Sequence, residues 1–141
     1  PGAPKAGGRL AAIVYGTPDK NAFFSTAVGI IRRRADLGPP LPGQPGPFSL
    51  GGPGVLESAF AKAGFHSIET RTIPAPLRMT ASGECVRFEQ ESFGALHQML
   101  NGLDDAGQRA AWDEIARELA KFDGPNGFEG PCELVVGVGG K

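Results

Sequence analysis

Three stretches of the chain carry the hydrophobic pattern of β-strands. The first, from Leu10 to Tyr15 and followed by Gly16, is an unbroken apolar run, which predicts a strand buried on both faces. Residues 132–138 contain a second run of this kind. Residues 67–73 are more polar, which predicts a strand nearer the edge of a sheet. A doubly buried strand needs neighbours on both sides, and only a tail, residues 1–6, precedes the first one in the sequence.

Apolar residues at helical spacing predict five helices between these strands. They cover residues 21–34, 53–63, 82–91, 93–103 and 105–122. The last helix has the clearest pattern: Asp105 and Gln108 resemble a capping pair at its start, and Trp112 lies on its apolar stripe, where we expect a core residue. Residues 38–54 are rich in proline and glycine, which predicts a long loop. These elements predict a single α/β domain over residues 1–141, with a small three-stranded sheet and four to five helices.

Composition and charge exclude several classes of function. The net charge is −1, and the single cationic run, Arg32-Arg33-Arg34, ends a predicted helix, where it compensates the helix dipole. We therefore expect no nucleic-acid partner. No stretch approaches the roughly 20 apolar residues of a membrane span, so we expect no membrane contact. Two cysteines in 141 residues argue against a disulfide scaffold and favour the cytoplasm.

The chain offers few candidates for catalysis. His66 and His97 lack acidic or cysteine partners at ligand spacing, and we interpret them as structural. The two cysteines are not paired at the spacing of a zinc site, and no G-x-S-x-G nucleophile motif is present. Glu89 and Glu91 are interpreted as part of a solvated helix face. The sequence therefore identifies no catalytic residue and no metal ligand.

The lead-in Ala6-Gly7-Gly8-Arg9 and the strand after it resemble the element around the fifth strand of class I S-adenosylmethionine (SAM)-dependent methyltransferases. The resemblance is closest to the small-molecule enzymes related to ubiquinone and menaquinone biosynthesis. The helix before Ala63-Gly64-Phe65 is similar to the helix and turn that enter the sixth strand of that family. Residues 129–138 resemble its closing strand, which is antiparallel and lies between the fifth and sixth. The resemblance thus implies the C-terminal half of a Rossmann-like methyltransferase domain, with a mixed sheet whose last strand is central.

The same resemblance implies what this half does. The family's glycine-rich cofactor loop belongs to the N-terminal half, which this sequence does not contain, so we expect no SAM binding by this chain alone. The complete family domain uses SAM as its cofactor. The segments after the first strand and in the proline/glycine loop help to close over the methyl acceptor, and the candidate acceptor-binding residues here are Tyr15, Asn21, Phe23, Phe24 and Phe48. For Phe23 and Phe24, the alternative is that one of them only packs its helix on the sheet.

Three hypotheses about function follow. The first is the acceptor-side portion of a methyltransferase for a small hydrophobic molecule, inactive alone, whose first strand lies at a sheet edge and pairs with its copy in a homodimer. The second is a stand-alone module that binds a small hydrophobic ligand without catalysis. The third is a scaffolding or regulatory subunit that completes its sheet on a separate, cofactor-bearing chain.

Overall fold

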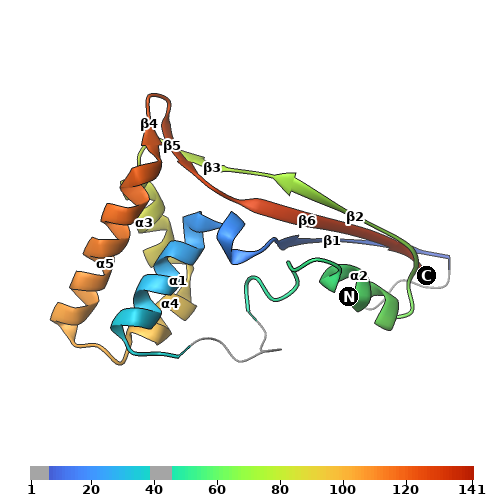
Figure 1. The fold of residues 1–141 in the computed structure, drawn as a ribbon, viewed down its shortest axis with the longest axis horizontal. Helices are drawn as coiled ribbons and strands as arrows, with labels where there is room; N and C mark the ends of the chain where they lie inside the picture. The colour runs from blue at the N-terminus through green and yellow to red at the C-terminus, as the bar shows by residue number, and fades with distance from the viewer. Residues whose placement is uncertain (1–6, 39–45) are drawn as a thin grey trace. The chain divides into compact units, whose positions relative to one another are not determined.

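The computed structural model describes residues 7–38 and 46–141, which form two compact units (Figure 1). The sheet unit comprises the described residues 7–20, 46–75 and 132–141. The helical unit comprises residues 21–38 and 76–131. The predicted tail, residues 1–6, and the middle of the predicted loop, residues 39–45, lie outside the described residues.

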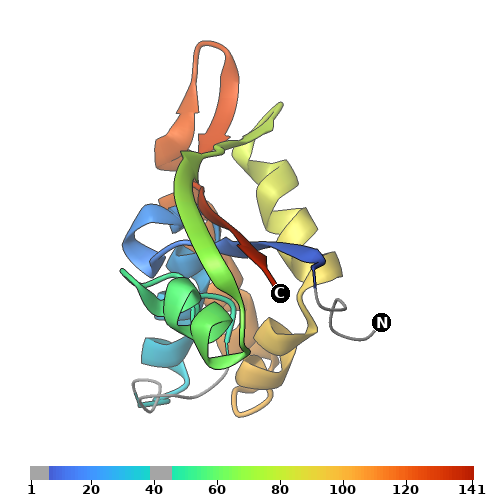
Figure 2. The same ribbon diagram turned by 90° about the vertical axis from the view of Figure 1, so that its right-hand side faces the viewer.

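The sheet unit is built on three strands in the order β1 (Arg9–Tyr15), β6 (Glu133–Gly140) and β2 (His66–Pro74). The predicted order, with the closing strand in the centre and antiparallel to its neighbours, is confirmed. The prediction of a mixed sheet is wrong for the described strands, because β1 and β2 both pair with β6 alone and both ladders are antiparallel. The strands fan with the twist usual for β-sheets (Figure 2).

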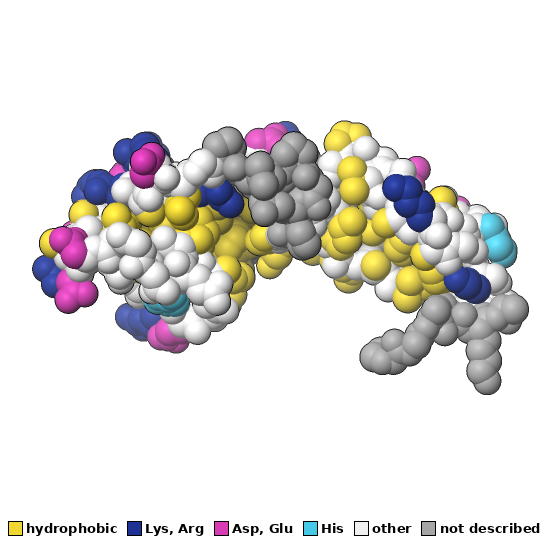
Figure 3. All heavy atoms as spheres, turned by 90° about the horizontal axis from the view of Figure 1, so that it is seen from below, with side chains coloured by type: hydrophobic (Ala, Val, Ile, Leu, Met, Phe, Trp, Pro, Cys, Tyr) yellow, Lys and Arg dark blue, Asp and Glu magenta, His cyan; other side chains and the backbone are white. Residues whose placement is uncertain are grey.

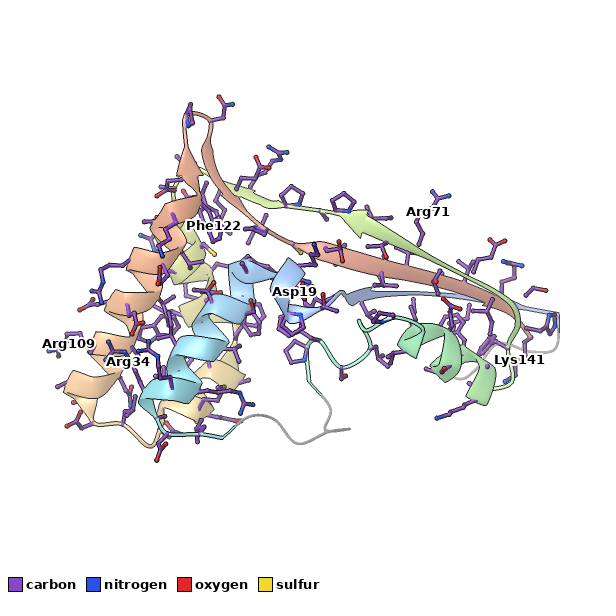
Figure 4. All side chains as sticks on the ribbon, viewed as in Figure 1. Asp19, Arg34, Arg71, Arg109, Phe122 and Lys141 are labelled. Atoms are coloured by element: carbon purple, nitrogen blue, oxygen red, sulfur yellow. The ribbon has the colours of Figure 1, made fainter. Side chains whose placement is uncertain are left out.

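One face of this sheet is covered by α2 (Val55–Lys62). Leu56, Phe60 and Phe65 are buried there and pack against sheet residues that include Ala12 and Val14. Residues at alternate positions point to the other face, since side chains alternate along a strand. Arg71 of β2, which belongs to that second set, points away from α2 (Figure 4).

The prediction that residues 10–15 are buried on both faces is therefore wrong within the described chain. Ile13, which shares its register row with Val136 and Arg71, is 66% exposed, and β1 lies at the edge of the sheet. The same prediction for the last strand is met in part, since Gly137, Gly139 and Gly140 are buried and residues 133–136 are half-buried. An apolar run indicates that a strand favours burial, but it does not indicate which other elements of the chain can cover its faces.

The helical unit contains α1 (Ala22–Arg34), α3 (Ser82–Ser92), α4 (Gly94–Leu100) and α5 (Asp105–Leu119). Together with α2, these helices lie within a few residues of the predicted bounds. The buried stripe of α5 is Ala111, Ile115 and Leu119, whereas Trp112 is half-buried beside His97, so the prediction of Trp112 as a core residue is corrected. α1 and α4 contribute further buried side chains to the core of this unit: Phe23, Phe24, Ala27, Ile31, Leu96 and Leu100.

A second, smaller sheet in the helical unit was not predicted. Its strands are β3 (Leu77–Met79), β5 (Gly127–Gly130) and β4 (Asp123–Gly124), all antiparallel, with β5 central. Gly127 has φ 100°, and a Cβ atom there would lie 2.7 Å from the Met79 carbonyl oxygen, so the hairpin requires glycine. Two 3₁₀ turns complete the described part of the chain, η1 (Pro18–Lys20) in the sheet unit and η2 (Ala120–Phe122) after α5.

The three arginines at the end of α1 bind within their own unit. Arg34 Nε donates to Glu114 Oε1 of α5 at 2.7 Å, Arg33 pairs with the other oxygen of that carboxylate, and Figure 4 shows where Arg34 lies. Arg32 donates to the Gly38 carbonyl oxygen at 2.6 Å, beyond the helix C-terminus. Hydrogen bonding from Arg34 is the main reason that the pKa of Glu114 is lowered. The cluster therefore joins two helices, in agreement with the structural interpretation of the run.

Candidate functional site

A cavity of about 490 Å³ lies beside the C-terminal half of β1 in the sheet unit. It is open to solvent, and its volume falls within the range of about 300–1,000 Å³ that is typical of small-molecule sites. The segment before α2 closes one side of it, and apolar side chains gather over α2 and this segment in Figure 3. The lining residues are Ile13, Val14, Tyr15, Gly46, Pro47, Ser49, Leu50 and Leu134.

Tyr15 and Phe48, two of the predicted acceptor-binding residues, meet at this cavity. Their ring centroids are 6.0 Å apart with an interplanar angle of 58°, a tilted aromatic contact. The segment that carries Phe48 is held by a turn in which the Gly51 amide donates to the Phe48 carbonyl oxygen at 3.2 Å. A Cβ atom on Gly51 would lie 2.3 Å from the Gly16 carbonyl oxygen, so this segment approaches the end of β1 closely and needs glycine there.

The described lining residues include no charged side chain. Burial raises the pKa of the Tyr15 phenol, and the nearby Cys132 raises it further. Tyr15 is therefore neutral near pH 7, and its phenol and the Ser49 hydroxyl are the polar side-chain groups among the described lining residues. Ser49 Oγ donates to the Gly46 carbonyl oxygen at 2.9 Å. Such a cavity suits a neutral, mostly apolar molecule with one hydrogen-bonding group.

The other three predicted site residues lie in the helical unit. Asn21, Phe23 and Phe24 are all buried, with exposed fractions of 0–3%. The Phe24 ring contacts Phe93 at a centroid distance of 4.5 Å, and the Phe23 amide donates to the Pro131 carbonyl oxygen at 3.2 Å. Both phenylalanines therefore pack the helical core, and their contact with a methyl acceptor stays a prediction.

Sequence reasoning missed Ile13, Leu50 and Leu134 as cavity residues. Leu50 carried a usable signal, because it is one of the few apolar side chains in a proline/glycine segment. Ile13 and Leu134 carried none, since both stand within apolar runs that predict burial inside a sheet.

Glu89 of α3 is the largest departure from the sequence-based interpretation. The sequence pattern predicts a solvated position for it, but its side chain is 0% exposed. Within the described residues, neither of its carboxyl oxygens has a hydrogen-bond partner. Burial raises its pKa to about 8. The missed signal is its spacing: Glu89 follows the buried Cys85 by four residues and so lies on the same helix face.

Other titratable residues do not form a catalytic cluster in the described chain. No group of three or more His, Cys, Asp or Glu side chains is arranged to hold a metal ion in these residues. His97 is exposed, and its Nε2 lies 2.6 Å from the Gln90 carbonyl oxygen. Cys85 is buried and Cys132 is half-buried, both as free thiols.

The described residues around this cavity lack the features of a SAM site. Gly16-Thr17-Pro18-Asp19, the segment after β1, is not a glycine-rich nucleotide loop, and the cavity lining offers no acidic side chain for ribose hydroxyls. The absence of SAM binding by this chain alone stays a prediction.

Comparison with known proteins does not identify the chain: no protein-family model matches it, and no curated protein sequence matches it either. Among the described helices, none has the length and apolar character needed to cross a bilayer. The structure shows an α/β protein with a cavity beside the edge strand β1.

Proposed function

We propose that this chain is the acceptor-side portion of a SAM-dependent small-molecule methyltransferase, and that it holds a small hydrophobic methyl acceptor against β1. The observation that supports this most is the cavity at the C-terminal end of β1, in a sheet of order β1-β6-β2. In open parallel α/β sheets, ligands bind beyond the carboxyl ends of the strands, and β1 and β2 run in the same direction on either side of β6. Tyr15 and Phe48, expected at the acceptor site from the resemblance, contact each other there.

The contribution of these residues is positional. Methyl transfer needs the acceptor atom in line with the methyl donor, and holding two reactants in that geometry supplies much of the rate enhancement. A mostly apolar wall with the rings of Tyr15 and Phe48 at one end would orient a phenol or a similar acceptor and exclude water from one side of it. This chain binds no SAM of its own in the proposal.

The first test is calorimetric titration of the chain with naphthols and other neutral phenols. We expect binding that Leu50→Ala weakens about tenfold, because the truncation removes apolar contact with the ligand. Ile73→Ala is the matched control: Ile73 and Leu50 have exposed fractions of 39% and 38%, but Ile73 does not line the cavity. Equal losses in the two variants, or no binding of any phenol, would contradict the proposed acceptor site. Micromolar binding of SAM by this chain would contradict the part of the proposal in which SAM binds to another polypeptide.

The alternative is a stand-alone hydrophobic-ligand or scaffolding module that dimerises through β1, and the exposed Ile13 on that edge strand is compatible with it. The two functions differ in whether a SAM-binding polypeptide accompanies the chain. Tagged chain recovered from its native host is crosslinked to radiolabelled SAM. Label on a co-purifying polypeptide supports the methyltransferase, whereas phenol binding without any labelled polypeptide supports the module.

A further inference from the structure

We propose that Glu89 is a protonation switch for the helical unit, which closes its α3–α4 corner when the carboxyl carries a proton and loosens it when the carboxyl ionises. This device lies outside the cavity of the sheet unit and goes beyond the proposed function. It rests on where the carboxyl is buried and on what surrounds it.

The first step is that the fold gives a charged Glu89 no compensation. Its side chain is fully buried, and its two carboxyl oxygens lack hydrogen-bond partners among the described residues. A buried carboxylate without a partner is strongly unfavourable, so the folded unit holds the neutral acid. Burial accordingly raises the pKa of this group to about 8, from an ordinary value of 4.5.

The second step concerns the groups around it. Cys85, one helical turn earlier, is the titratable neighbour, and its pKa is raised to about 12 by burial and then by Glu89, so it stays a neutral thiol.

The helices that pack on α3 turn uncharged side chains to the core, whereas their charged groups are exposed or paired elsewhere. On α4, His97 contacts the Gln90 carbonyl oxygen; on α5, Glu114 pairs with the α1 arginines and Arg109, Asp113 and Arg117 are exposed. Elsewhere, Arg78 of β3 pairs with Glu129, Lys121 of η2 pairs with Glu118, and Asp123 accepts hydrogen bonds from Ser82 at the start of α3. On α3 itself, Glu84, Arg87 and Glu91 are exposed.

The third step identifies what would move. α3 ends at Ser92 and α4 begins at Gly94, so Phe93 forms the corner between them. The Phe93 amide donates to the carbonyl oxygen of Glu89 itself at 3.2 Å, and the Phe93 ring contacts Phe24 and Phe88. Phe93 follows Glu89 by four residues, so the two lie on the same side of the helix end, and the proposal places the opening at this corner.

The test is urea unfolding at pH 6 and pH 9, followed by the fluorescence of Trp112 in α5, the only tryptophan. Between pH 4.5, the ordinary pKa of a glutamate, and about 8, the pKa of Glu89 in the folded unit, the folded state keeps the Glu89 proton and the unfolded chain has lost it. The equilibrium constant for unfolding therefore rises up to tenfold per pH unit in this range, so stability decreases as pH rises. We expect the wild-type urea midpoint to fall from pH 6 to pH 9. Glu89→Gln should remove most of that fall. Glu91→Gln, a change at an exposed residue of the same helix, should keep it, and all three proteins retain His97. A fall in Glu89→Gln as large as in wild type would overturn the proposal.

A second measurement serves if Glu89→Gln does not fold. In a Cys132→Ser background, alkylation of the buried Cys85 reports opening of the unit. The rate is divided by that of the urea-unfolded chain at the same pH, which cancels the intrinsic pH dependence of the thiol. We expect the protection of Cys85 to decrease as pH rises from 6 to 9. Protection that stays constant would refute the switch.

Discussion

Two aspartates satisfy backbone groups that the helices of the helical unit cannot pair for themselves. Asp104 Oδ1 accepts the Gly107 amide at 2.7 Å and so caps α5. Asp123 accepts both the amide and the hydroxyl of Ser82 at the start of α3, at 2.8 and 2.7 Å. The first amides of a helix have no partner within the helix, so each of these bonds replaces one that the backbone leaves unmade.

Removal of the cap at Asp104 should therefore destabilise the helical unit measurably. We expect Asp104→Ala to lower its free energy of unfolding by about 1 kcal/mol. Urea unfolding followed by Trp112 fluorescence measures this, because Trp112 lies within α5. Asp113→Ala, in the exposed middle of the same helix, is the control and should cost less than about 0.5 kcal/mol. Equal effects of the two variants would show that Asp104 is not the cap.

The sequence predicted this cap one residue too late. Asp104 and Asp105 are adjacent, and the spacing from Asp105 to Gln108 resembles a capping box. In the structure, Gln108 Nε2 instead donates to the carbonyl oxygens of Leu100 and Leu103, at 3.2 and 3.1 Å. Either aspartate satisfies the local pattern, and the choice depends on how the chain leaves α4, which the sequence does not reveal.

At the scale of elements, α2 packs closely on β6 because glycines form the contact. A Cβ atom on Gly137 would lie 2.8 Å from Leu56 Cδ2, and one on Gly139 would lie 2.9 Å from Phe60 Cδ2. Lys141 holds the other end of the helix, since its ammonium donates to the Ala63 carbonyl oxygen and lies 4.7 Å from the Phe65 ring centroid (Figure 4). The separation of helix and sheet is thus set by residues without side chains.

Filling this contact should loosen the sheet unit. We expect Gly137→Val to lower its free energy of unfolding by about 1–3 kcal/mol, because a valine would overpack against Leu56. Gly29→Ala in α1 of the helical unit is the contrasting variant. A Cβ atom there meets nothing within 4 Å, so alanine should stabilise that unit by about 0.5–1 kcal/mol. Thermal unfolding of both variants measures the difference. A neutral Gly137→Val would mean that α2 can move away from β6 at little cost.

The elements that sequence pattern predicted well are those with their own periodicity. All five helices, and the three strands of the larger sheet, carry enough residues to show it. The smaller sheet was missed because β3, β4 and β5 have three, two and four residues, too few for alternation to appear. The candidate site was predicted in part for a related reason. Tyr15 and Asn21 are close in sequence, but the boundary between the two units falls between Lys20 and Asn21, and no pattern marks it.

At the scale of the whole molecule, the two edges of the larger sheet differ in how they are protected. Along its seven residues β1 pairs only with β6 in the described structure, and Ile13 and Leu10 are 66% and 36% exposed. β2 carries the features that blunt an edge, namely a register shift between His66 and Glu69, charged side chains and Pro74 at its end. An unprotected apolar edge recruits another strand, whereas a protected one does not.

We therefore predict a homodimer in which the β1 strands of two copies pair. Light scattering coupled to size-exclusion chromatography at tens of micromolar should give twice the chain mass of 14.6 kDa. Ile13→Lys should return the protein to a monomer, because a lysine on an edge strand opposes pairing. Ile73→Lys, on the protected edge, should leave the dimer intact. A monomeric wild type would exclude self-pairing at β1. A dimer that survives Ile13→Lys but not Ile73→Lys would place the interface on β2, and the difference between the two edges would then not direct association.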